Sequence, residues 1–156
     1  MSYLKRTITI LMFAVGIASL ATPAHAQHCT NAKLAGNWAF TLSGTLVLPT
    51  GPVPIAAVGA ATLGANGTLA GTEARSVGGQ YADETETGTF SVNSDCTGSM
   101  TINFYEDGQL VRTSVLSIVV DTANTEVRMV QASLTLPDGT VLPIIATVEA
   151  KRMLLQ

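Results

Sequence analysis

Short turn sequences divide this chain, after residue 30, into about eight segments of strand length. The segments alternate apolar and polar residues and are rich in threonine and β-branched residues, which suit a pleated sheet. Glycine, proline, asparagine and aspartate cluster between the segments, and no stretch between them has the periodicity of a helix. Every connection is short, so the sequence predicts an all-β domain whose neighbouring strands pair antiparallel.

The turn positions place the expected strands closely. We expect strands over 36–48, 55–63, 68–77, a segment through the acidic residues 83–87 to 92, 98–105, 109–120, 126–136 and 141–153. An open sheet of this size would leave two exposed edges, and closure removes them. The predicted fold is therefore an eight-stranded antiparallel up-and-down barrel, with a two-sheet β-sandwich as the alternative.

The first 26 residues have the three parts of a secretory signal peptide. Lys5 and Arg6 form a positive start, residues 8–20 are apolar, and 24–26 read Ala-His-Ala. This pattern predicts cleavage before Gln27 and a protein that is periplasmic or secreted, with no membrane association after cleavage. The remaining residues, 27–156, make one β-barrel domain in this interpretation.

Export determines how the two cysteines and the net charge are interpreted. Cys29 and Cys96 would enter an oxidising compartment, where we expect them to form a disulfide; two free thiols or a metal pair are the alternative. Without Lys5 and Arg6, six basic residues face eleven acidic ones. No basic stripe is present to neutralise phosphates, so we expect no nucleic-acid partner.

Few residues of the chain point to catalysis or to a cofactor. His28 is the only histidine after the predicted cleavage site, and it lies beside the new N-terminus. One histidine and two distant cysteines do not make the usual zinc sites, so we expect no metal. The glycine-rich stretches punctuate hairpins and precede no helix, so they predict no phosphate-binding loop and no cofactor.

Charged residues on the third and fourth segments are the exception. Glu73 and Arg75 are two residues apart and share one face of a strand, and Glu84 and Glu86 share a face with Phe90. We interpret these side chains as a solvated outer face. The alternative is a polar cluster inside an apolar barrel, in which each buried group would need a partner.

The remaining observations concern the barrel's lining and its mouth. We expect Arg112 and Arg128 to be external, and Tyr81 and Tyr105 to lie beside turns at a barrel mouth. The segment 55–63 carries small side chains at most positions. Small lining residues either leave room for a ligand or let a flattened barrel close on itself.

One short motif supports a family resemblance. Gly36-Asn37-Trp38 at the start of the first strand resembles the Gly-x-Trp signature of the calycins, the barrels that include lipocalins and avidins. The resemblance implies that Trp38 closes one end of the barrel under an arginine, Arg152 or Arg128. Biotin binding is not expected, because avidins need further tryptophans and Trp38 is the only one.

A second resemblance rests on architecture and on two short stretches. Residues 88–90 (Gly-Thr-Phe) and 95–98 (Asp-Cys-Thr-Gly) look similar to small exported barrels related to allene oxide cyclase. No catalytic motif accompanies this similarity. It implies a cofactor-free barrel enzyme of the cyclase or isomerase kind, with Glu73, Arg75 and Tyr105 as candidates.

Binding rather than catalysis is the function that the sequence favours. We expect a barrel that binds a small apolar or amphipathic molecule. The candidate ligand-binding residues are Trp38, Tyr81, Tyr105, Glu73 and Arg75. The cyclase-like enzyme is one alternative. The other is a secreted inhibitor that contacts a protein partner through a loop over 49–54.

Overall fold

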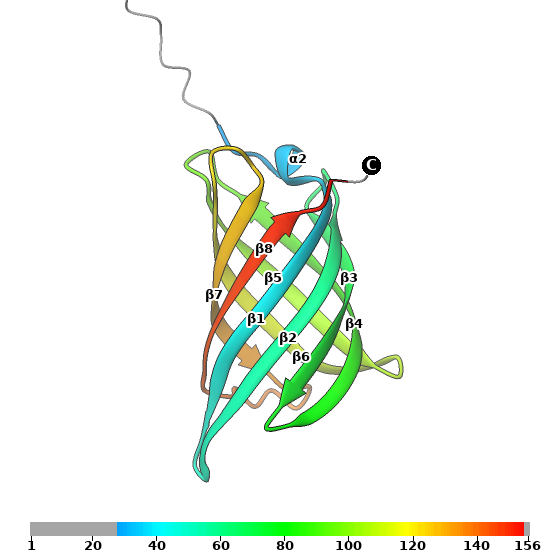
Figure 1. Cartoon of the computed structure of the whole chain (residues 1–156), viewed down its shortest axis with the longest axis vertical. Coiled ribbons are helices and arrows are strands. Elements are labelled where there is room, and N and C mark those ends of the chain that lie inside the picture. The colour runs from blue at the N-terminus through cyan, green and yellow to red at the C-terminus, as the bar shows by residue number, and fades with distance from the viewer. Residues whose placement is uncertain (1–27, 155–156) are drawn as a thin grey trace, which may run out of the picture.

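The computed structural model describes residues 28–154, so the predicted signal peptide lies outside the described residues. Within this range, one short helix precedes eight strands (Figure 1). The elements are α2 (Asn31–Leu34), β1 (Gly36–Leu48), β2 (Gly51–Leu63), β3 (Thr68–Val77), β4 (Gln80–Val92), β5 (Thr97–Glu106), β6 (Gln109–Val120), β7 (Glu126–Thr135) and β8 (Ile144–Arg152). No helix within residues 28–154 is long and apolar enough to cross a membrane.

The eight strands form one closed antiparallel barrel in sequence order. Each strand pairs with its neighbour in the chain, and β1 closes the ring by pairing with β8 from Trp38 opposite Arg152 to Leu46 opposite Ile144. The predicted up-and-down barrel is confirmed, and the alternative of a sandwich is wrong. Every strand therefore has a hydrogen-bonded neighbour on both sides, and the ring of strands can be followed in Figure 1.

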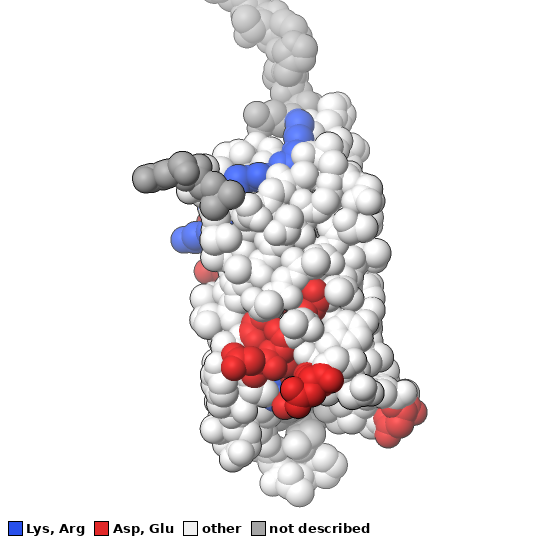
Figure 2. Space-filling view, turned by 90° about the vertical axis from the view of Figure 1, so that its right-hand side faces the viewer, with Lys and Arg blue, Asp and Glu red and all other residues white. Residues whose placement is uncertain are grey.

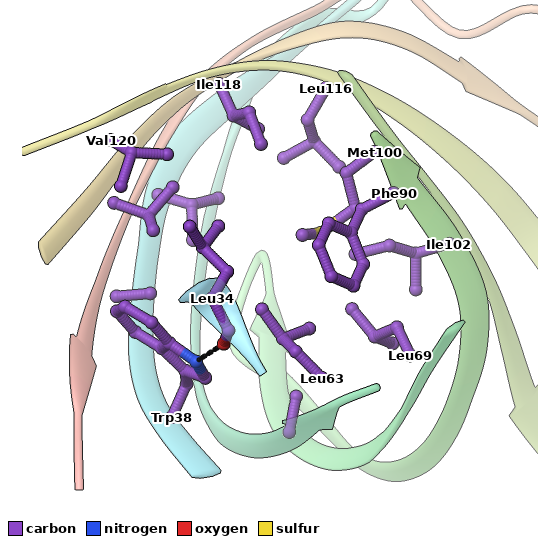
Figure 3. Close-up of a cluster of buried hydrophobic side chains, with 14 of the residues drawn as sticks. Leu34, Trp38, Leu63, Leu69, Phe90, Met100, Ile102, Leu116, Ile118 and Val120 are labelled. Atoms are coloured by element: carbon purple, nitrogen blue, oxygen red, sulfur yellow. Dashed lines mark hydrogen bonds between the residues drawn. The ribbon is translucent and has the colours of Figure 1, made fainter. Parts of the chain in front are cut away.

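The period of two along each strand defines the barrel's interior. Inward residues of the half nearest α2 form one apolar cluster, part of which is drawn in Figure 3. Trp38, Leu63 and Phe90 come from three different strands and meet Leu34 of α2 there. Side chains therefore fill this end of the barrel.

The helix α2 is an element that the sequence interpretation missed. It is a single turn, begins after the N-cap Thr30, and buries Leu34 completely at the end of the barrel. The disulfide between Cys29 and Cys96 is confirmed and joins the segment before α2 to the turn after β4. The side chain of Asn31 accepts a hydrogen bond from the Val92 amide at 2.9 Å, so α2 is attached at two points.

The expected break over residues 49–54 is wrong. β2 already begins at Gly51, and only Pro49 and Thr50 form the turn. Pro52 lies opposite Val47 of β1. The amide of Val47 points away from β2 and donates its hydrogen bond to the carbonyl oxygen of Pro143. The nitrogen of Pro52 therefore faces away from β1, toward the side of β2 that pairs with β3. The pairing with β3 does not extend as far as Pro52, so no hydrogen-bond donor is required there. The long loop proposed for a protein partner does not exist.

Smaller differences concern the ends of two other strands. β4 begins at Gln80, directly after the turn at Gly78 and Gly79, because the β3–β4 hairpin pairs along its whole length. β8 begins only at Ile144, after Pro143, and Val141 makes a single isolated bridge. Neither difference changes which strands are neighbours.

Candidate functional site

The barrel interior holds a small cavity in its apolar half. Its volume is about 50 Å³. Side chains from all eight strands line it, among them Trp38, Phe40, Met100, Met129 and Ala150. The polar groups among the lining residues are Glu73, Glu86, Ser114 and Gln131. The cavity is thus an apolar space with a few polar groups, which is the usual character of a small-molecule site.

One end of the cavity is closed by a connected set of contacts. The indole nitrogen of Trp38 donates to the carbonyl oxygen of Leu34 at 2.9 Å (Figure 3). The guanidinium of Arg152 lies 4.7 Å from the centre of the Trp38 ring and donates to the carbonyl of Ala35 at 2.8 Å. The expected cation over Trp38 is therefore Arg152. Arg128 instead lies on the outer face beside Glu126, so the expectation that Arg128 is external is confirmed.

The charged residues of β3 and β4 lie inside the barrel, so the predicted solvated outer face is wrong. Glu73, Glu84 and Glu86 are only 2–4% exposed. The pairing of β3 with β4 explains this, because Gly71 lies opposite Glu86 and Glu73 opposite Glu84. The same face continues to the buried Leu69 and Phe90, which share their strands' inward phase.

Two arginines neutralise part of this cluster. Glu84 accepts hydrogen bonds from both Arg75 and Arg112, and Arg112 also donates to Glu73. Arg75 reaches Glu106 as well, at 3.6 Å. The expectation that Arg112 is external is wrong. Its guanidinium points inward and lies 3.9 Å from the centre of the Phe104 ring.

Glu86 differs from the other two glutamates because it has no hydrogen-bond partner among residues 28–154. Both of its carboxyl oxygens are buried and make no hydrogen bond. Gly71 leaves the space that the carboxyl group occupies, since a Cβ atom there would lie 2.5 Å from Glu86 Oε1. The nearby polar pair is already engaged, with Gln131 Nε2 donating to Ser114 Oγ at 2.9 Å. Glu86 is thus a buried, unpaired acid on the wall of the cavity.

The three carboxyl groups differ in acidity because their surroundings differ. Burial, reinforced by the charge of Glu73, raises the pKa of Glu86 to about 8. Burial also raises the pKa of Glu73 to about 7, although Arg112 opposes this rise. For Glu84, burial alone would raise the pKa, but hydrogen bonds from Arg75 and Arg112 outweigh it and lower the pKa. At neutral pH the cluster therefore holds protons mainly on Glu86.

A second space opens at the other end of the barrel, away from α2. This vestibule has a volume of about 170 Å³. Its lining is apolar except for Arg75 and Arg112, whose partners Glu73 and Glu84 lie deeper. Because Arg112 lines the vestibule and Glu73 lines the cavity, the ion-paired cluster separates the two spaces.

The two tyrosines are not part of the interior. Tyr81 is 67% exposed and donates to Asp83 on the outer face. Tyr105 borders a groove of about 700 Å³ on the outside of β2 to β4, together with Asp83 and Asp107. Figure 2 shows acidic side chains gathered on this face. Glu73, Arg75 and Tyr105, the candidate catalytic set, therefore do not converge on the cavity.

The sequence interpretation also missed residues that the structure brings to the site. Ser114 and Gln131 line the cavity, but β-bulges at Phe104/Tyr105 and at Val115/Leu116 shift the strand registers near them. Simple alternation does not report such shifts. Within residues 28–154, no three histidine, cysteine, aspartate or glutamate side chains are placed to hold a metal ion.

Fold and cavity together define a closed eight-stranded barrel with a partly polar, mainly apolar interior. No protein-family profile and no curated protein sequence matches the chain. Among solved structures it is similar to EF1p2_mFAP2b bound to DFHBI, with 14% identity, a TM-score of 0.54, and coverage of 78% of this chain and 94% of that chain.

Two further solved barrels have comparable similarity. The redesigned beta barrel mFAP1 bound to DFHBI is 18% identical, with a TM-score of 0.50 and coverage of 78% of this chain and 97% of that one. The redesigned beta barrel b11L5F_LGL is 16% identical, with a TM-score of 0.50 and coverage of 80% and 95%. At these identities the likeness shows the fold alone.

Proposed function

We propose that this protein binds a small, mainly apolar molecule inside the barrel, in the cavity beneath Trp38. The observation that carries the proposal is the buried, unpaired carboxyl group of Glu86 on the wall of an apolar cavity. Such a group is costly in a core that serves stability alone. Two barrels of similar architecture, EF1p2_mFAP2b and mFAP1, are bound to DFHBI, which supports a binding role for a barrel of this shape.

The size of the cavity limits the ligand. Sites for drug-sized molecules measure about 300–1,000 Å³, whereas this cavity measures about 50 Å³. The ligand is therefore a small molecule, and side chains move when it enters. Met100 and Met129 line the cavity, and the flexible thioether side chain of methionine adapts to such changes.

We further propose that the barrel is of the calycin type and that it functions after export. The placement of Arg152 over Trp38 supports the first proposal. The disulfide between Cys29 and Cys96 supports the second, because disulfides persist in oxidising compartments. Mass spectrometry of the protein recovered from the periplasm or medium tests export, and a mature chain that starts at Gln27 is expected. Retention of residues 1–26 in the cytosol contradicts it.

Native mass spectrometry of the gently purified protein tests the binding proposal. We expect extra mass that is lost on denaturation, or, for an emptied protein, saturable uptake of toluene or 1-hexanol reported by Trp38 fluorescence. Trp38 is the only tryptophan of the chain and lines the cavity.

Ala150→Leu is the matched control for location, because Ala150 lines the same cavity and a larger side chain fills it. This variant is expected to abolish the uptake while its circular dichroism spectrum stays that of the barrel. Uptake that is absent in the native chain, or that persists unchanged in Ala150→Leu, refutes an interior site.

A further inference from the structure

The carboxyl group of Glu86 lacks a donor because every charged neighbour is engaged elsewhere. The charged groups that act on it are Glu73 of β3, Glu84 of β4 and Arg112 of β6. Arg112 binds Glu73 and Glu84, and Arg75 binds Glu84 and Glu106. From β5, the residue opposite Glu86 is Phe104, which offers no donor side chain.

With all three of its carboxyl groups ionised, the interior cluster would be one positive charge short. Three carboxyl groups, of Glu73, Glu84 and Glu86, face only two guanidinium groups, of Arg75 and Arg112. Buried charges are stable when each is paired, and a lone buried carboxylate is not. The missing cation belongs on the cavity side of Glu86, where the surrounding lining is apolar.

We propose that the ligand of this cavity is a small primary amine with an apolar chain or ring, whose ammonium group pairs with Glu86. The inference rests on the interior binding proposed above and names the chemistry of that ligand. The ammonium supplies the missing charge and the missing hydrogen-bond donors, while its hydrocarbon part lies against Trp38 and Met100.

Binding of this kind releases a proton. With its pKa at about 8, Glu86 is about nine-tenths protonated at pH 7. Pairing with an ammonium ion requires the carboxylate, so the Glu86 proton passes to the buffer as the amine enters. The amine itself stays protonated, since alkyl ammonium groups such as that of lysine have a pKa of about 10.4. Affinity should therefore rise about tenfold between pH 7 and pH 9.

The test compares hexylamine with 1-hexanol, which has the same chain and a neutral head group, on the emptied full-length mature protein. Trp38 fluorescence reports occupancy. Calorimetry in two buffers of different ionisation enthalpy counts protons. We expect tighter binding of hexylamine, with release of about 0.9 proton at pH 7, and no proton release with hexanol.

Two variants isolate the role of Glu86. Glu86→Gln keeps the side chain's shape and removes its charge. This variant is expected to weaken the affinity for hexylamine at pH 9 by about thirtyfold or more and to change the affinity for hexanol little. Glu149→Gln makes the same chemical change at an exposed, outward position of β8 and should alter the affinity for neither ligand.

The outcomes separate this inference from the interior site itself. Three results would refute an amine ligand but not the interior site: equal binding of amine and alcohol, no proton release, or hexylamine binding that survives in Glu86→Gln. Tighter binding of the alcohol would also refute an amine ligand, because it would show that a protonated Glu86 hydrogen-bonds a hydroxyl group instead. Failure of both ligands and of toluene refutes the interior site, and the amine with it.

Discussion

Replacing Glu86 by glutamine should make the barrel more stable at neutral and alkaline pH. The carboxyl group titrates at about 8 in the folded chain, against a reference value of 4.5. Between these two pH values the folded state holds a proton that the unfolded chain has released. The chain therefore takes up a proton when it folds. Stability from this group is complete below about pH 4.5 and is lost as the pH rises through about 8.

The size of the effect follows from the two pKa values. A shift of this size corresponds, by the linkage relation, to a loss of roughly 3–4 kcal/mol from Glu86 between pH 5 and pH 8. Glu73, whose pKa of about 7 is also raised, adds a slope of the same sign. Glu84 has a lowered pKa, so its contribution to stability is lost as the pH falls below its unfolded value, which is the opposite direction.

Urea unfolding followed by Trp38 fluorescence, with the disulfide intact, measures the effect at about pH 5, 6, 7 and 8. We expect the free energy of unfolding of Glu86→Gln to exceed that of the native chain by an amount that grows with pH. Glu149→Gln, at an exposed position, should run parallel to the native chain throughout. A difference between Glu86→Gln and the native chain that is independent of pH would refute the reasoning.

Three other perturbations test separate parts of the structure by urea unfolding. Gly71→Ala should destabilise the barrel by about 1–3 kcal/mol, because its Cβ would lie 2.5 Å from both Glu86 Oε1 and the Ala60 carbonyl oxygen; an unchanged midpoint would contradict this. Arg112→Met leaves Glu73 and Glu84 short of a partner and should cost about 3–5 kcal/mol at neutral pH, less at about pH 5; a cost that grows on acidification would count against the ion pairs. Replacing Cys29 and Cys96 together by alanine should cost about 4 kcal/mol, since their bond closes a loop across 67 residues; a loss below about 1 kcal/mol would show that α2 holds its place without it.

The order and pairing of the strands could be predicted because the turns are marked in the sequence. β1, β3 and β6 have the predicted bounds, since glycine, proline, asparagine or aspartate stands at or beside each of their ends. The short connections predicted antiparallel neighbours, and the two exposed edges of an open sheet predicted closure. The error at 49–54 arose because proline was taken to end a strand, although the nitrogen of Pro52 faces an unpaired side of β2.

The polar cluster could not be predicted because one strand's pattern does not say which face is internal. Along β3, the inward face carries Leu69, Gly71, Glu73 and Arg75, and the outward face carries small and polar residues. Charge alone suggests solvent for Glu73. Its burial depends on Arg112, which lies thirty-nine positions away on β6, and that pairing exists only once the barrel closes.

The acid that weakens this fold and the acid that would bind a ligand are the same group. A cation beside Glu86 would oppose the burial and the Glu73 charge that raise its pKa, so the bound protein would take up less of a proton on folding. Ligand stabilisation should then grow with pH over the range in which the empty barrel loses stability. A ligand that stabilises the barrel equally at about pH 5 and pH 8 would bind without engaging Glu86. Measured side by side, the stability curves of the empty and loaded barrel therefore report directly whether this carboxyl group is the binding determinant.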